Sequence, residues 1–227
     1  MQDWTTLEAK LDAQGWALLP DRIGADICAA LAVFWNDEPR FRSHVHMARH
    51  GFGLGEYRYF TYPLPELVAS LREQLYPPLA GIANRWAERM GQTRRFPDSH
   101  AVFLESCRAA GQNRPTPLLL RYESGDWNAL HQDVYGALVF PLQVAILLSE
   151  PGRHFEGGEF VLTEQRPRMQ SRAEVVPLGQ GDAVVFPVRE RPVRGGRGDY
   201  RVQMRHGVSR VRAGLRFTLG IIFHDAP

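Results

Sequence analysis

The sequence predicts an α+β fold in which a double-layered β core is supported by N-terminal helices. Residues 1–114 read mainly as helices, whereas short β-rich runs separated by Gly, Pro or Asp follow from about residue 115. Helices followed by strands, without alternation between the two, argue against a parallel βαβ sheet. The 227 residues contain no evident repeat or linker, so we expect a single domain over residues 1–227, with its β core in 115–227.

The first half of the chain carries several helical patterns and one short strand. TTLEAKLDAQG places Leu7 and Leu11 one turn apart and ends at Gly15. The next run, GWALLPD, reads as a strand. Because proline interrupts helical hydrogen bonding, Pro77-Pro78 is predicted to separate two later helices. The remaining helical patterns cover residues 22–35, 66–76, 82–91 and 97–112.

The second half reads as about eight short strands, the spacing expected of a sandwich or a small barrel. The candidate strands are PLLLRY (117–122), NALHQDV (128–134), QVAILLS (143–149), GGEFVLT (157–163), AEVVPL (173–178), DAVVFPV (182–188), VQMRHGV (202–208) and LRFTLGIIF (215–223).

Composition and charge narrow the class of protein. Cys28 and Cys107 form no C-x-x-C pattern, which indicates a reducing compartment and excludes a cysteine zinc site. We find neither a signal peptide nor an apolar run long enough to span a membrane, so the cytoplasm is expected and a membrane partner is not. Residues 163–216 hold twelve Arg against five acids, although the net charge is only +2. This bias suits an anionic partner such as nucleic acid, or a solvated basic face.

The stretch NALHQDVYG contains the strongest candidate for a metal site. On a strand, His131 and Asp133 would point to the same face and could take adjacent positions on a divalent ion. A similar pair, His154 and Glu156, lies between Gly-containing turns and is expected in a loop. His206, on a later strand, is the natural third ligand. Two His and one carboxylate leave three positions open, which suits Fe(II) that must bind a chelating cosubstrate and O₂.

Arg216 and Thr218 follow His206 by ten and twelve residues in LRFTLG. They share one face of a predicted strand, and an Arg in an apolar strand is costly unless it is paired. Its fork suits a carboxylate, with the Thr hydroxyl as a further donor. The pair is either a clamp for a dicarboxylic cosubstrate or an Arg bound to an internal acid.

In combination, H-x-D, a distal His and R-x-T ten residues later resemble the Fe(II)- and 2-oxoglutarate-dependent dioxygenases. Their prolyl-hydroxylase-like branch is resembled over residues 115–223 by RYESGDWNALHQD, ILLSEPGRHFEGGEFVL and GDAVVFP. The whole chain is similar to a bacterial family of such oxygenases that is predicted to remove alkyl lesions from DNA bases, by analogy with AlkB-type enzymes.

The resemblance implies a double-stranded β-helix (jelly-roll) core with helices packed against it. It implies that His131, Asp133 and His206 hold Fe(II) and are the catalytic centre, and that Arg216 and Thr218 bind the C5 carboxylate of 2-oxoglutarate. Tyr122 is either a further donor to that carboxylate or a core tyrosine. The implied reaction oxidises a substrate C–H with O₂ and releases succinate and CO₂.

The substrate is less constrained than the chemistry. The spacing between His206 and Arg216 is shorter than in AlkB and more like that of protein hydroxylases, although the family-level resemblance points to alkylated DNA. A hydroxylase of a protein residue or small metabolite is therefore the alternative. A non-catalytic, cupin-like binding barrel is the second alternative.

Three other segments contain residues that could bind a metal or a substrate. HVHMARH, with His44, His46 and His50, resembles a metal tract but has no acidic ligand nearby in the sequence, so a solvated segment is predicted. Residues 51–60 could form a substrate lid, but a β-hairpin that packs aromatic residues into the core is favoured. Residues 189–201 read as a mobile basic loop. Arg210 and Arg212 either reach a substrate phosphate or are exposed.

Overall fold

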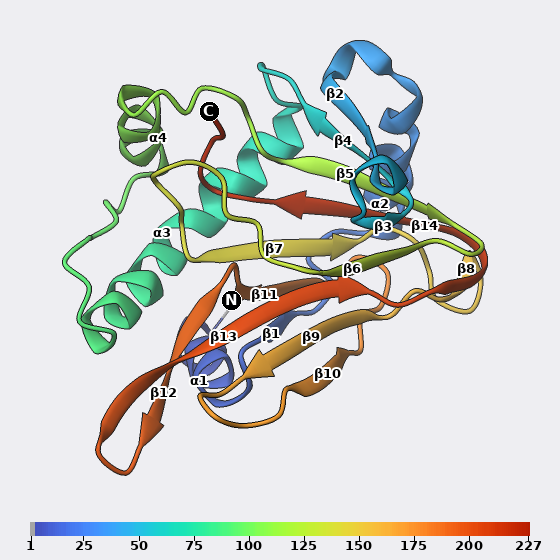
Figure 1. Cartoon of the computed structure of the whole chain (residues 1–227). Coiled ribbons are helices and arrows are strands. Elements are labelled where there is room, and N and C mark those ends of the chain that lie inside the picture. The colour runs from blue at the N-terminus through green and yellow to red at the C-terminus, as the bar shows by residue number, and fades with distance from the viewer. Residues whose placement is uncertain (1–2) are drawn as a thin grey trace.

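The computed structural model describes residues 3–227, which form two antiparallel β-sheets facing each other, with helices on the outer side of one of them (Figure 1). The larger sheet has the order β1-β11-β7-β14-β5-β4-β2, with β8 paired to β14. The smaller sheet has the order β10-β9-β13-β6-β3, with β12 paired to β13. This arrangement is the predicted α+β fold with a double-layered core.

The predicted strands of the second half are all present. They correspond to β5 (Leu118–Glu123), β6 (Trp127–His131), β7 (Leu142–Leu147), β9 (Phe160–Gln165), β10 (Arg172–Val176), β11 (Ala183–Pro187), β13 (Gly198–Val208) and β14 (Val211–Ile221). Two short strands were not predicted, β8 (Phe155–Gly157) and β12 (Glu190–Gly195).

Four α-helices and three short 3₁₀ helices are found in the described part of the chain: α1 (Trp4–Gln14), α2 (Ala25–Val33), α3 (Glu66–Arg89), α4 (His100–Ala109), η1 (Phe34–Asn36), η2 (Glu38–Arg40) and η3 (Met47–His50). Asp3 caps the start of α1 by accepting from the amide of Thr5 at 3.0 Å. Gly15 ends the helix in the left-handed region, as a Gly stop requires.

The predicted break at Pro77-Pro78 is wrong, because α3 runs unbroken through both prolines. Each proline removes one helical hydrogen bond, but Tyr76 and Leu79 on either side of the pair are completely buried in the main core. Packing of this apolar face outweighs the lost bonds. Arg72 further anchors α3 by an ion pair of 2.8 Å with Asp225 near the C-terminus.

Residues 41–60 contribute to the β core, although the first 114 residues were predicted to be mainly helical. β2 (Phe41–His46) and β4 (Glu56–Phe60) pair with each other, and β4 continues the larger sheet beside β5. β3 (Gly53–Leu54) adds to the edge of the smaller sheet, and β1 (Ala17–Leu19) pairs with β11. Tyr59 and Phe60 are buried, as the favoured hairpin interpretation of this segment requires.

The predicted mobile loop at residues 189–201 is instead an antiparallel hairpin of β12 and β13. Arg191 is completely buried and binds Glu164 through its guanidinium, and it donates to the backbone oxygen of Asp12 at 2.7 Å. Val193 and Val202 pack together in a small core of their own. The basic composition suggested a solvated loop because the cross-strand partners cannot be seen in the sequence.

No helix in residues 3–227 is long and apolar enough to cross a membrane.

Candidate active site

The three predicted metal ligands converge between the two sheets. His131 is the last residue of β6, and His206 lies directly opposite it on β13. The imidazole centroids are 4.2 Å apart, and Asp133 Oδ2 is 3.2 Å from His206 Nε2. Asp133 Oδ1 is 3.5 Å from His131 Nε2. One ligand atom from each residue lies within 4.8 Å of the other two, which is close enough for one ion.

The expectation that His131 and Asp133 both lie on a strand is wrong, because β6 ends at His131. The chain turns away from the sheet there, and the side-chain amide of Gln132 fixes the turn. It donates to the backbone oxygens of Met204 at 2.8 Å and Arg189 at 3.1 Å. This anchorage, rather than strand alternation, directs the carboxylate of Asp133 toward the two imidazoles.

Neighbouring groups orient the ligands. His131 Nδ1 donates to the backbone oxygen of Ala129 at 2.8 Å, which leaves its Nε2 lone pair free for a metal. The hydroxyl of Tyr135 donates to Asp133 Oδ1 at 2.7 Å, and Tyr59 donates to Tyr135 at 3.2 Å. Gln143, buried on β7, lies 3.5 Å from His206 Nε2. Sequence reasoning missed Tyr135, although it continues the same H-x-D-x-Y spacing.

Burial and hydrogen bonds shift the pKa values of the three predicted ligands in different directions. Burial alone would raise the pKa of Asp133, but hydrogen bonds from His131 and His206 lower it well below its usual range. Burial lowers the pKa of His206, whereas the bond to Asp133 raises that of His131 in spite of its burial. These shifts favour an ionised Asp133 beside the two imidazoles, which is the form that binds a divalent cation.

Arg216 and Thr218 lie side by side on β14, facing the interior. Arg216 is 1% exposed, and its Nη1 donates to Thr218 Oγ1 at 2.6 Å. Its guanidinium lies 5.5 Å from the ring centroid of the buried Tyr122. No carboxylate forms an ion pair with Arg216 in residues 3–227, and its Nε has no hydrogen-bond partner there. An internal acid therefore does not account for this buried cation.

Two features show how far the fold accommodates this guanidinium. Burial lowers the pKa of Arg216 to about 10, so the group is still charged at neutral pH. Gly158 leaves the space that the side chain occupies, because a Cβ there would lie 2.9 Å from Arg216 Cδ. The backbone of Gly158 also has a positive φ of 61°, which favours glycine.

One cavity of about 390 Å³ connects the predicted metal ligands with the predicted clamp. Tyr57 and Tyr59 of β4 line its wall, and the exposed side chains of Phe52 and Leu130 stand at its edge. The predicted site residues that share this cavity are His131, Asp133, His206, Arg216, Thr218 and Tyr122.

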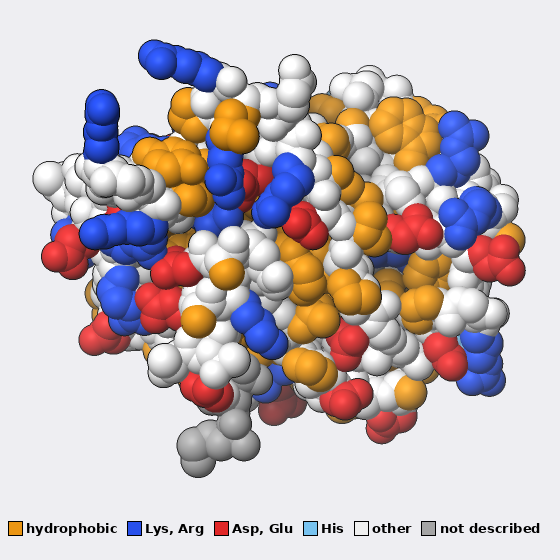
Figure 2. Space-filling view, turned by 90° about the horizontal axis from the view of Figure 1, so that it is seen from below, with side chains coloured by type: hydrophobic (Ala, Val, Ile, Leu, Met, Phe, Trp, Pro, Cys, Tyr) orange, Lys and Arg blue, Asp and Glu red, His pale blue; other side chains and the backbone are white. Residues whose placement is uncertain are grey.

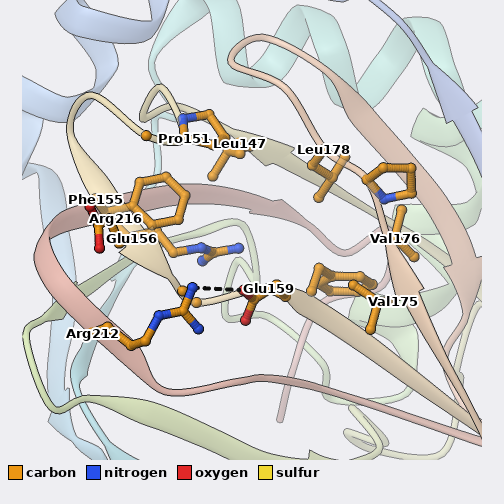
Figure 3. A pocket seen from close by; sticks show the side chains of 15 residues that line it. Leu147, Pro151, Phe155, Glu156, Glu159, Val175, Val176, Leu178, Arg212 and Arg216 are labelled. Carbon is orange, nitrogen blue, oxygen red and sulfur yellow. Dashed lines mark ion pairs between the residues drawn. The ribbon is translucent and has the colours of Figure 1, made fainter.

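A second cavity of about 310 Å³ is also lined by Arg216 (Figure 3). Its walls are largely apolar, formed by residues such as Leu147, Phe155 and Leu178. Arg212 points toward it and forms an ion pair of 3.5 Å with Glu159, drawn as a dashed line in Figure 3. Arg210 and Arg212 are both exposed, and Arg212 pairs with an acid of its own protein.

Residues 55–226 match the family Oxygenase-NA, which is described as an oxygenase catalysing oxidative methylation of damaged DNA. The chain belongs to the Oxygenase-NA family. An uncharacterized protein of Mycobacterium tuberculosis (strain CDC 1551 / Oshkosh) is 52% identical to it over 167 residues, covering 74% of this chain and 72% of the relative.

Solved structures show the same fold for this Oxygenase-NA protein. A prolyl-4-hydroxylase of Pseudomonas putida is 16% identical, with a TM-score of 0.54 over 96% of each chain. A 2OG-Fe(II) oxygenase family oxidoreductase of Burkholderia pseudomallei is 20% identical, with a TM-score of 0.51 over 99% of this chain and 93% of the other. Family and fold together confirm the predicted jelly-roll core and the enzyme class, an oxygenase built on the 2-oxoglutarate/Fe(II) dioxygenase fold.

Proposed function

We propose that this protein uses Fe(II), 2-oxoglutarate and O₂ to oxidise alkyl groups on bases of DNA. One observation carries the chemical part of the proposal: a His-Asp-His cluster and a buried, acid-free guanidinium open into the same cavity. A buried cation without a partner favours an anionic ligand, and the cluster offers the donors that iron takes in a facial triad.

The donor set fits a ferrous ion. His131 and His206 present Nε2 atoms, and Asp133 is held ionised beside them. No cysteine lies among the candidate ligands, so a closed thiolate zinc site is not supported. With three protein ligands on the ion, the remaining positions would face the cavity and accept the cosubstrate.

The opposite wall of the cavity fits the far carboxylate of 2-oxoglutarate. Arg216 would bind it through its fork, with the hydroxyl of Thr218 beside it. Asn128 donates to the Tyr122 oxygen at 3.2 Å, which leaves the phenolic proton of Tyr122 free to donate to the ligand. When bound, ion, 2-oxo acid and O₂ supply the oxidant that converts a substrate C–H to C–OH, while the 2-oxo acid loses CO₂ and becomes succinate.

The protein would contribute orientation and exclusion of water. Asp133 is held by Tyr135, and His131 by the Ala129 carbonyl, so the ligands need little rearrangement when the ion binds. On an N-methyl base, oxidation would give an N-hydroxymethyl group. Its C–N bond then breaks, formaldehyde leaves, and the nitrogen keeps the hydroxyl proton.

Three features support a nucleobase as substrate. The family description names damaged DNA. The cavity mouth presents Phe52, 47% exposed, and the wall presents Tyr57 and Tyr59, and such rings stack on bases. Arg189 and Arg205, whose segments adjoin the predicted metal ligands, are exposed and form no ion pair in residues 3–227. The ten-residue spacing from His206 to Arg216 supports a second candidate, a hydroxylase of a protein residue.

We place the reaction in the cytoplasm, because Cys28 and Cys107 are both free thiols, as a reducing compartment would keep them.

The test is succinate release from the full chain with Fe(II), 2-oxoglutarate and a panel of methylated oligonucleotides, unmethylated oligonucleotides and peptides. We expect succinate and formaldehyde to be released together, and only when methylated DNA is present. Succinate release that depends on a peptide would instead identify a protein residue as the substrate. No 2-oxoglutarate turnover with any substrate would leave a non-catalytic barrel as the better description.

A further inference from the structure

A second group of metal-binding side chains lies at the outer edge of the larger sheet, on strands β2 and β4. His44 Nε2 is 3.0 Å from Glu56 Oε2, and His46 Nδ1 is 3.2 Å from Glu56 Oε1. The two imidazole centroids are 4.4 Å apart. These separations resemble the edge of a tetrahedron around zinc, roughly 3.3 Å for metal–ligand distances of 2.0 Å.

The acid that HVHMARH lacks in the sequence is supplied by the fold. His44 and His46 share one face of β2, and antiparallel pairing sets Glu56 of β4 opposite His46. The expectation of a merely solvated segment missed this carboxylate, which is ten residues from His46 in the chain. His50, the third His of the motif, lies apart on η3 and stacks against Phe52.

This group is separate from the candidate active site. Side chains alternate along β4, so Tyr57 and Tyr59 line the main cavity while Glu56 belongs to the other face. Figure 1 shows β2 and β4 as the last strands of the sheet, beyond β5. The His44, His46 and Glu56 side chains are 32%, 38% and 28% exposed, so an ion can reach them from solvent.

We propose that His44, His46 and Glu56 bind a second divalent ion, of the borderline type that imidazole and carboxylate ligands prefer, such as Zn²⁺. The two ring nitrogens and a Glu56 oxygen supply three ligands, and water completes the tetrahedron. The ion takes the place of the hydrogen bond that joins His44 to Glu56. It fastens β2 to β4 and so stiffens the strand that presents Tyr57 and Tyr59 to the cavity.

Two neighbouring arginines limit the affinity. Arg121 Nη1 lies 3.9 Å from Glu56 Oε2, and Arg58 Nη2 lies 3.4 Å from His44 Nδ1. The Arg58 contact is lost when His44 binds through Nε2, because Nδ1 then carries the proton. Arg58 keeps its hydrogen bond of 2.9 Å to the Trp35 carbonyl. The site is therefore weaker than a buried zinc site, and removing Arg121 strengthens it.

The experiment counts zinc ions on the purified full chain by calorimetric titration, with metal analysis after gel filtration. We expect two ions on the wild type, one on His131→Ala/His206→Ala, and one on His44→Ala/His46→Ala. The variant with all four substitutions binds none. In the His131→Ala/His206→Ala background, zinc also raises the thermal midpoint, and the control His50→Ala leaves the count at one.

Two milder variants keep the test decisive if the alanine variants fold poorly. In the His131→Ala/His206→Ala background, Glu56→Gln lowers the zinc affinity at least about tenfold. Arg121→Gln raises it several-fold. The proposal is overturned if that background binds no zinc, or if its zinc persists without His44 and His46. Loss of the active-site ion alone would instead count against the proposed catalytic centre, so the two failures are distinguishable.

Discussion

At the scale of single residues, the burial of Arg216 gives the strongest support for the proposed cosubstrate site. A guanidinium that is 1% exposed loses most of its hydration, and the two other arginines that are as deeply buried recover that loss from acids. Arg72 pairs with Asp225, and Arg191 with Glu164. Within residues 3–227, Arg216 contacts only the hydroxyl of Thr218 and aromatic faces in this way. This contrast supports the proposal that its partner is a bound cosubstrate.

We expect Arg216→Met to raise the KM for 2-oxoglutarate about 10- to 100-fold, since a hydrogen bond to a charged group contributes about 1.5–3 kcal/mol. Metal affinity should stay unchanged, because the guanidinium is not a ligand. Arg216→Lys should fall between, as it keeps the charge but loses the fork. Steady-state kinetics and metal titration measure these effects, and an unchanged KM would place the clamp elsewhere.

The same substitution should not destabilise the ligand-free protein. Removing an unpaired buried charge is expected to leave the free energy of unfolding unchanged or to raise it by ~1 kcal/mol or more. Cosubstrate at 100 times its Kd, with Mn²⁺ in place of iron, should stabilise the wild type by about 2.7 kcal/mol and Arg216→Met far less. Denaturant melts measure both quantities, and a strong loss of stability without ligand would indicate a structural Arg.

Tyr135→Phe should weaken metal binding about 10-fold, because its hydroxyl donates to the Asp133 carboxylate at 2.7 Å and orients it. Tyr59→Phe is the matched control: it removes a hydroxyl that reaches Asp133 only through Tyr135, so its effect should be smaller. Calorimetric titration with Mn²⁺ gives the affinities. Equal affinities in the wild type and Tyr135→Phe would show that the hydroxyl has no positioning role.

At the scale of elements, the sequence was informative wherever the pattern is local. Alternating β-rich runs located the strands from β5 to β14 except β8 and β12, and helical periodicity located α1, α2 and α4. Prediction from the sequence failed where contacts between residues far apart in the chain determine the structure. The prolines of α3 are tolerated because the helix packs on a sheet, and β12 is anchored by the ion pair between its Arg191 and Glu164 of β9.

The candidate site divides along the same line. H-x-D, the distal His and R-x-T are local spacings, and their residues do share one cavity, although their roles remain predictions. Tyr135, Gln143 and Glu56 could not be assigned, because each acts on a residue from another strand or beyond a turn. Which residues face one another depends on register, and register is set by the folded sheet.

The junction of α3, α4 and the end of β14 should make the fold sensitive to acid. Burial lowers the pKa of His100 to about 3, where its Nε2 donates to the Phe223 carbonyl at 2.9 Å. Below pH 6.5 the His100 side chain takes up a proton in the unfolded chain but not in the folded protein. Its contribution to the free energy of unfolding is therefore fully present above pH 6.5 and is lost as the pH falls. From pH 6.5 to 5 this amounts to about 2 kcal/mol.

His100→Gln should therefore flatten the pH dependence of stability between pH 6.5 and 5, while the exposed His50→Gln leaves it as in the wild type. Urea unfolding at several pH values gives the slopes directly. Equal slopes for the wild type and His100→Gln would mean that His100 is hydrated in the folded state.

At the scale of the whole molecule, ion pairs with acidic residues offset part of the positive charge of the arginines. On the face shown in Figure 2, basic side chains stand beside acidic ones instead of forming one basic field. Several arginines of residues 163–216 are paired, for example Arg166 with Glu164 and Arg201 with Glu190. Those without an ion pair in the described chain, the buried Arg216 aside, are Arg168, Arg189, Arg197, Arg205 and Arg210.

Of these unpaired arginines, Arg189 and Arg205 belong to chain segments that adjoin the predicted metal ligands. Gln132, the residue between two predicted metal ligands, bonds to the Arg189 and Met204 carbonyls, and Arg205 precedes His206 on β13. If DNA enters this mouth, Arg189→Gln/Arg205→Gln should weaken binding to a single-stranded methylated oligonucleotide. The plot of the logarithm of the binding constant against the logarithm of the salt concentration should become shallower by about 1.4, as expected for two lost phosphate contacts.

Arg168→Gln/Arg197→Gln is the control, because it makes the same change in net charge at the outer turns and should alter this slope less. Fluorescence anisotropy over a salt series measures both doubles, and a larger effect of the outer pair would move the DNA-binding surface away from the cavity.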